Sequence, residues 1–244
     1  MKMSVLVCLL LIGSANVSLT AQDQSQVTTW KYPISVAASA DAIYVADRQL
    51  PGIWLVKDGK AEVYFQADKK IGSVLNAVRC LAFDQSGHLV VGDSATRDVY
   101  RFDEQRVPHA LTDGKIGIPM GIAVAKDGSL FVSDLELKQI VRILVDSKDI
   151  EVVANVTAPT GLALAANGDV LVVCRAKDPV RRVTTAGEVS VVVSGIPFGF
   201  AQDIAVDSEG KIFVTDGYAK AIYSVTPGEA PTKLLAGNPL VHPV

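Results

Sequence analysis

The sequence is poor in cysteine. Its 244 residues contain three, and Cys8 lies in an apolar N-terminal segment, so a fold stapled by several disulfides is excluded. The other two, Cys80 and Cys174, occupy unlike positions in the repeat described below. We expect both to be small buried side chains rather than partners in a disulfide.

Positive charge is not in excess either. The formal net charge is -3, and lysines and arginines are scattered singly along the chain. Such a surface offers no basic field for a phosphate backbone, so nucleic acid is excluded as a partner. Aromatic residues make up only 6% of the chain, whereas apolar residues make up 49%. The apolar residues are mostly Val, Ile, Leu and Ala, which suits strands packed face to face.

No apolar run is long enough to span a bilayer. Residues 5–12 are apolar, follow Lys2 and precede small residues, a pattern typical of a secretory signal peptide. We therefore expect residues 1–21 to be a signal peptide cleaved after Ala15 or Ala21, with an apolar N-terminal strand as the alternative. The mature chain would then be exported, either to the periplasm or to the extracellular space, without a membrane span.

A repeat with a period near 40 residues organises the rest of the chain. Five units share a six-residue apolar run, a turn containing glycine or small residues, and a second run that usually ends in Asp. The first runs are residues 33–38, 78–83, 119–124, 159–164 and 201–206, and the second runs end at residues 47, 93, 134, 174 and 216. Such a period is typical of propeller blades and of helical arrays. The runs are short, β-branched and separated by turns, which favours strands.

Each unit contains two further apolar runs. The third runs are residues 53–56, 99–102, 140–143, 180–183 and 222–225, and the fourth are residues 61–65, 108–111, 151–154, 189–193 and 232–235. Each unit is therefore predicted to be a four-stranded antiparallel blade. Because one blade cannot bury both of its faces, successive blades must stack around a central channel. The predicted fold is an all-β β-propeller in which five complete blades are visible.

The pattern Pro-x-Gly-Ile-Ala-Val, then Asp-Gly, then Phe-Val-x-Asp, strongest in residues 119–143, resembles the NHL repeat. The resemblance covers about residues 32–237 and implies six blades. Residues 240–244 repeat the opening of a unit and then stop, so we expect the propeller, residues 32–244, to be truncated by about one blade. A five-bladed ring with a short tail is the alternative. Residues 22–31 would form an N-terminal segment in which residues 27–30 are a possible closing strand.

The NHL resemblance implies that the loops entering each first strand and those following each second strand share one face of the ring. Polar and charged candidates for a ligand site lie at the start of the first strands and in the loops after the second strands, and Asp203 directly follows the candidate Gln202. These candidates are Arg79, Thr160, Gln202 and Asp203 in first strands, and Arg48, Arg97, Arg175 and Tyr218 after second strands. An arginine cluster at a channel mouth would hold a carboxylate or a sulfated sugar through paired hydrogen bonds. The alternative is that these are solvated loop charges.

The aspartates that end the second runs recur in four of the five units, with Cys174 in the remaining one. They are Asp47, Asp93, Asp134 and Asp216. Four carboxylates in a ring would suit Ca²⁺. An Asp at the end of a strand, however, commonly accepts hydrogen bonds from the backbone of the following turn. Because the residue recurs with the repeat, we expect this structural role.

Residues 159–163 and 202–210 also resemble gluconolactonase and senescence-marker-protein propellers, which implies a divalent cation held by Glu, Asn and Asp. Thr160 and Gln202 stand here where that family has Asn and Asp. Asp203 is one position off, and a shift of one residue turns a strand side chain to the other face. We therefore expect the metal site of these lactonases to be degraded or absent.

Peptide-amidating lyases use a similar propeller with histidine ligands to zinc. His88, His109 and His242 occupy unlike positions, which argues against a shared zinc site. The sequence thus favours a non-catalytic binding module without a cofactor, whose partner is a protein or a small carbohydrate or lactone. The alternatives are a metal-dependent lactone hydrolase, using Ca²⁺ or another divalent cation with part of its site in a missing blade, and a sensor domain of a larger receptor.

Overall fold

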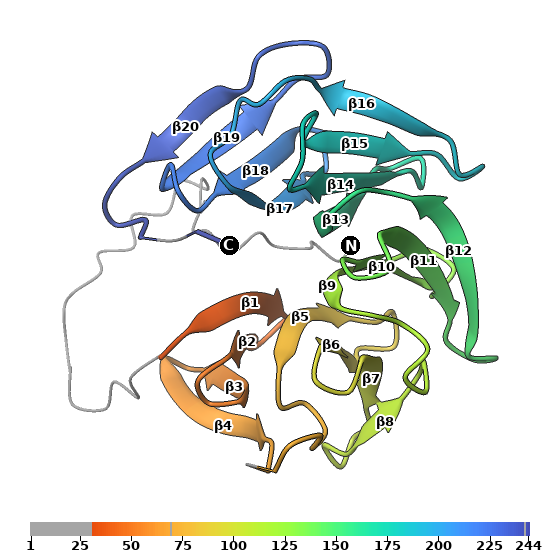
Figure 1. Ribbon diagram of the computed structural model, residues 1–244. Helices are drawn as coiled ribbons and strands as arrows, with labels where there is room; N and C mark the ends of the chain where they lie inside the picture. Colours follow the sequence, from red (N-terminus) through yellow and green to blue (C-terminus); the bar gives the residue numbers. More distant parts are fainter. Residues whose placement is uncertain (1–30, 69, 242) are drawn as a thin grey trace.

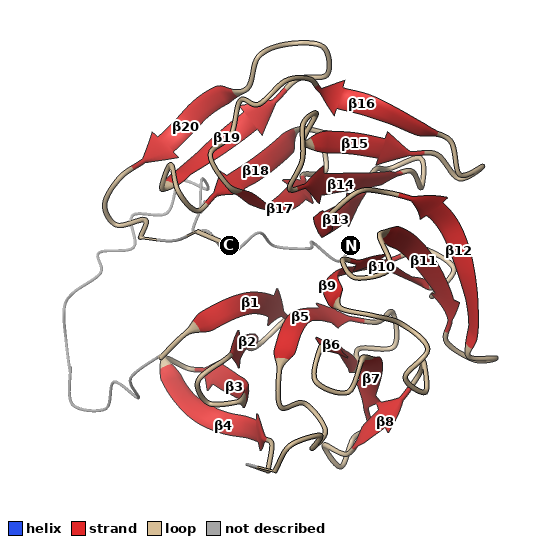
Figure 2. Ribbon diagram, in the orientation of Figure 1, coloured by secondary structure: helices blue, strands red, loops and turns tan. Residues whose placement is uncertain are grey.

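The computed structural model describes residues 31–68, 70–241 and 243–244. The predicted signal peptide, the possible closing strand at residues 27–30, and His242 lie outside these residues. Twenty strands form five separate four-stranded antiparallel sheets, and the described residues contain no helix (Figure 2). The sheets stand side by side around a central opening (Figure 1). The chain is an all-β, five-bladed propeller, as its repeat predicts.

The blades follow one another in sequence, each with its strands in the order first to fourth from the centre outward. Blade 1 contains β1 (Pro33–Ala38), β2 (Ile43–Asp47), β3 (Gly52–Lys57) and β4 (Lys60–Gln66). Blade 2 contains β5 (Val78–Phe83), β6 (Leu89–Asp93), β7 (Asp98–Phe102) and β8 (Pro108–Ala110). Blade 3 contains β9 (Pro119–Val124), β10 (Leu130–Asp134), β11 (Gln139–Leu144) and β12 (Asp149–Asn155). Blade 4 contains β13 (Pro159–Leu164), β14 (Val170–Cys174), β15 (Val180–Val183) and β16 (Val189–Val193). Blade 5 contains β17 (Ala201–Val206), β18 (Ile212–Asp216), β19 (Ala221–Val225) and β20 (Thr232–Ala236).

Glycine makes the turn between the first and second strands of blades 2 to 5. Gly87, Gly128, Gly168 and Gly210 have φ angles between 84° and 89°. Side chains with a Cβ rarely adopt this conformation, so these glycines allow the tight hairpins to form.

Every first strand contains a β-bulge near its start, where the pairing with the second strand shifts register. In β17, for example, the shift lies between Ala201 and Ile204. A bulge places an extra residue on one strand and interrupts the strict alternation of side chains between the two faces. This irregularity affects which residues reach the channel.

Apolar side chains fill the interfaces between neighbouring blades. Second strands contribute most: β6, β10 and β14 are buried along their whole length. Four apolar clusters join blade 1 to 2, 2 to 3, 3 to 4, and 4 to 5. Cys80 and Cys174 are both buried and carry free thiols.

The first strands pack in series, β1 against β5, β5 against β9, β9 against β13, and β13 against β17. Among the described residues, no comparable packing joins β17 back to β1. The segment after β20 runs toward the centre of the ring (Figure 1), and Val241 and Val244 line the cavity there. The sixth blade stays a prediction.

Candidate functional site

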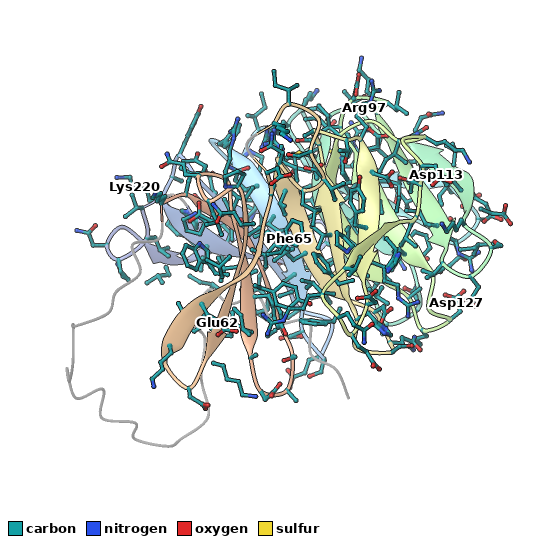
Figure 3. All side chains as sticks on the ribbon, turned by 90° about the horizontal axis from the view of Figure 1, so that it is seen from below. Glu62, Phe65, Arg97, Asp113, Asp127 and Lys220 are labelled. Atoms are coloured by element: carbon teal, nitrogen blue, oxygen red, sulfur yellow. The ribbon has the colours of Figure 1, made fainter. Side chains whose placement is uncertain are left out.

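The ring encloses a central cavity of about 2690 Å³ that is bordered by the first strands of all five blades. The loops that follow the second strands surround one of its ends, which we call the mouth. A view of the ring from its edge places Arg97 and Lys220, from two such loops, at one rim, and Asp127 and Glu62 at the opposite rim (Figure 3).

The recurrent aspartates fix the loops around the mouth. Asp134 is fully buried and accepts hydrogen bonds from the backbone N–H groups of four residues, at 2.7 to 3.1 Å. Asp216 likewise accepts hydrogen bonds from four backbone N–H groups, in the loop before β17 and the loop after β18. Burial alone would raise the pKa of Asp47, but backbone N–H groups and the Trp54 indole hold it below its ordinary value. These carboxylates are therefore occupied by the protein's own backbone.

Asp93 acts similarly in blade 2, where it accepts hydrogen bonds from Ala77 N and from the backbone and hydroxyl of Thr96. In the described part of the chain, no group of three or more His, Cys, Asp or Glu side chains is arranged to hold a metal ion.

Three arginines meet at the mouth, and we call this group the arginine mouth: Arg48, Arg79 and Arg175. All three border the cavity. Desolvation, and then the charge of Arg48, lowers the pKa of Arg79. Desolvation, and then the charge of Arg79, lowers the pKa of Arg175. Arginine is not deprotonated in proteins, so three like charges gather at the mouth; Arg79 and Arg175 are partly desolvated, whereas Arg48 is exposed.

Within the described residues, none of these arginines forms an ion pair with a carboxylate. Arg79 Nε donates to the Ser94 hydroxyl at 2.9 Å. Arg175 donates from its Nη2 to Gln202 Oε1 at 2.8 Å. Both partners are neutral, so the positive charge at the mouth is not neutralised by these contacts.

The aromatic ring of Phe200 holds Arg175 in place. Its guanidinium lies 4.4 Å from the centre of the Phe200 ring. The ring of Tyr218 stacks on Phe200 as well, with centroids 4.7 Å apart and planes inclined by 17°. Stacking and the bond to Gln202 together fix the guanidinium before any ligand arrives, which lowers the entropic cost of binding. Tyr218 itself is 71% exposed.

Asp203 lies one residue deeper in the channel than Gln202, because Ala201 pairs with Asp216 at the mouth and β17 runs inward from there. Strict alternation would turn Gln202 and Asp203 to opposite faces. With the bulge in β17, both residues border the cavity. Burial raises the pKa of Asp203 to about 6.

Two other candidates do not join this group. The Thr160 side chain is 1% exposed and donates its hydroxyl hydrogen bond to Val173 O within blade 4. Arg97 forms an ion pair with Glu136 at 2.9 Å and does not line the cavity. His88 and His109 also pair locally, with Asp84 and Arg101 and with Asp103 respectively.

Sequence reasoning missed Phe200 and Gly161. Phe200 precedes β17 and supports Arg175, but an aromatic residue in one loop of one repeat carries no distinguishing signal. Gly161 belongs to the repeat pattern, and its further role as space for the Asp203 carboxylate depends on packing between blades.

No protein-family model matches the sequence, and no curated protein matches it. Solved structures do resemble the fold. A protein in a nidogen/laminin complex matches with a TM-score of 0.72 and 17% identity over 86% of this chain and 81% of that one. A gluconolactonase from Xanthomonas campestris matches with a TM-score of 0.71 and 17% identity over 85% of this chain and 76% of that one. A virginiamycin B lyase from Staphylococcus aureus matches with a TM-score of 0.63 and 16% identity over 85% of each chain. At such identities these likenesses extend to the fold and not to the site.

Proposed function

We propose that this chain is an NHL-type propeller that works outside the cytoplasm as a non-catalytic binding module and captures an anionic ligand at the arginine mouth. One observation carries the proposal: Arg48, Arg79 and Arg175 converge on the cavity without a carboxylate partner among the described residues. Arg97 differs from these three, because it pairs with Glu136 and does not border the cavity.

Like charges brought together in a partly desolvated place repel one another and reduce stability. A bound anion removes this repulsion and accepts charge-assisted hydrogen bonds from the guanidinium groups. The three arginines therefore favour an anionic ligand over a neutral one, and the stacked Arg175 supplies a fixed point for it.

Calorimetric titration of the purified protein tests the proposal, with sulfate, citrate and glucuronate as anions and glucose as the neutral control. We expect one-to-one binding of at least one anion. Replacing Arg79 by Met keeps the apolar stem and removes the charge, so Arg79→Met should weaken binding about tenfold or more. Arg97→Met is the matched control and should bind as the natural protein does.

Failure of every anion to bind would reject an anion-binding function. Equal affinity in the natural protein and in Arg79→Met and Arg175→Met would reject the arginine mouth as its site.

A metal-dependent lactone hydrolase is the second candidate, because Asp203 supplies one carboxylate to the channel. The residues at two positions that the resemblance assigns to metal ligands do not favour it: Thr160 is buried in a backbone hydrogen bond and Gln202 holds Arg175. If this second candidate is right, Ca²⁺ or Zn²⁺ must raise the melting temperature and δ-gluconolactone must be hydrolysed.

A further inference from the structure

We infer that the ligand of the arginine mouth is a small acidic sugar, whose acid group is held by the arginines and whose hydroxyl groups are bound by Asp203. This inference rests on the proposed function and names the class of ligand that the same cavity takes.

The Asp203 carboxylate has one oxygen available for a ligand. Its Oδ1 accepts a hydrogen bond from Ile204 N at 2.8 Å. Oδ2 forms no hydrogen bond within the described residues, and since no fully buried polar atom there lacks a partner, Oδ2 is not fully buried; Asp203 borders the cavity. A carboxylate oxygen facing a cavity is a strong acceptor for a hydroxyl hydrogen.

The neighbouring blade is shaped around this carboxylate. Gly161 in β13 lies beside Asp203, and a Cβ on Gly161 would come within 1.9 Å of Oδ1 and 2.6 Å of Cα of Asp203. Gly121 has the same position in blade 3, and a Cβ there would meet the backbone of blade 4 at 3.1 Å. Close approach of these backbones requires glycine, and at Gly161 the space that a side chain would fill is taken by the Asp203 carboxylate.

The spacing suits a ligand with an acid group at one end and hydroxyl groups along its length. Gln202, which holds Arg175, and Asp203 are adjacent along β17, where the rise is about 3.3 Å per residue. Gln202 holds the Arg175 guanidinium at the mouth, and Asp203 follows one residue deeper along β17. The exposed ring of Tyr218 beside them offers an apolar face of the kind on which the C–H face of a sugar packs.

Charge decides between hydroxyl and ammonium as the group that Asp203 binds. Three arginines and one aspartate leave the region positive, so a ligand ammonium would be repelled by the same guanidinium groups that attract its acid. Neutral hydroxyl groups carry no such penalty. An acidic monosaccharide therefore fits better than an amino acid, and its acid group is a carboxylate or a sulfate.

Calorimetric titration at pH 7.5 tests the inference with five ligands: glucuronate, glucose 6-sulfate, propionate as an acid without hydroxyl groups, glucose, and alanine. We expect the natural protein to bind glucuronate or glucose 6-sulfate about tenfold more tightly than propionate. Asp203→Ala should remove this advantage and leave propionate unchanged. Asp149→Ala, which alters an exposed aspartate of β12, should change neither affinity.

The outcomes separate this inference from the proposed function. If Asp203→Ala and the isosteric Asp203→Asn both bind the sugar acids as tightly as the natural protein, while Arg79→Met still weakens binding, the sugar assignment is wrong and the anion site stands. If alanine binds more tightly than glucuronate, the ligand is not a sugar. If no acid binds at all, the proposed function itself fails.

Discussion

Asp203 is a residue whose charge is unfavourable for folding, and we propose that it binds a ligand. Burial raises its pKa to about 6, so between about pH 4 and pH 6 the folded protein binds more protons at this site than the unfolded chain does. The protonated Asp203 therefore favours the folded state at low pH, and this contribution to the free energy of unfolding is lost as the pH rises through about 6. Residues that reduce stability in this way are common at binding sites.

Replacing Asp203 by Asn should stabilise the protein at neutral pH, because the amide keeps the shape and the acceptor for Ile204 N without the buried charge. We expect the free energy of unfolding at pH 7.5 to rise by about 1–3 kcal/mol, a value reduced from the full pKa shift because the side chain is partly exposed. Urea denaturation at pH 7.5 and at pH 4 measures it. The gain should shrink at pH 4, and a gain that is equal at both values would mean that charge is not its cause.

At the scale of the elements, the turn aspartates bind the loops that build the mouth. Asp134 accepts hydrogen bonds from four backbone N–H groups, two in the loop before β9 and two in the loop after β10. Buried donors that lose their acceptor cost more than the hydrogen bonds themselves contribute.

The substitution Asp134→Ala should therefore lower the free energy of unfolding by about 3 kcal/mol or more. Asp149→Ala, at an exposed site in the same blade, should change it by about 0.5 kcal/mol or less. Denaturant unfolding of the two variants gives both values. A loss for Asp134→Ala no larger than that for the control would show that this carboxylate does not hold the loops.

All twenty strands could be predicted from the sequence, with each end placed to within one or two residues. Short β-branched runs and the glycine turns at Gly87, Gly128, Gly168 and Gly210 recur with the repeat, so each blade supports the assignment of the others. The part that could not be predicted is where individual side chains point.

Two pairs of residues show why. Arg79 reaches the cavity whereas Arg97 turns to Glu136 in the adjacent loop, and only the folded loops distinguish them. Gln202 and Asp203 reach the same cavity because of a bulge that the strand pattern does not reveal. Side-chain direction depends on register and on loop closure, and both are properties of the assembled ring.

At the scale of the whole molecule, the ring brings charges from different blades to one opening. Arg48, Arg79 and Arg175 belong to blades 1, 2 and 4, and lie far apart in the sequence. The same architecture occurs in a nidogen/laminin complex, in a gluconolactonase and in a virginiamycin B lyase. The fold therefore leaves the function open, and our proposal rests on the charges at the mouth.

The most direct test of the arginine mouth is a crystal structure of the protein soaked in selenate, a divalent anion whose selenium is located by anomalous scattering. We expect one strong selenium peak at the mouth, with selenate oxygens within hydrogen-bonding distance of Arg79 and Arg175, and no such peak in Arg79→Met crystals. Selenate found only elsewhere, or a mouth in which protein carboxylates already pair with all three arginines, would contradict the account.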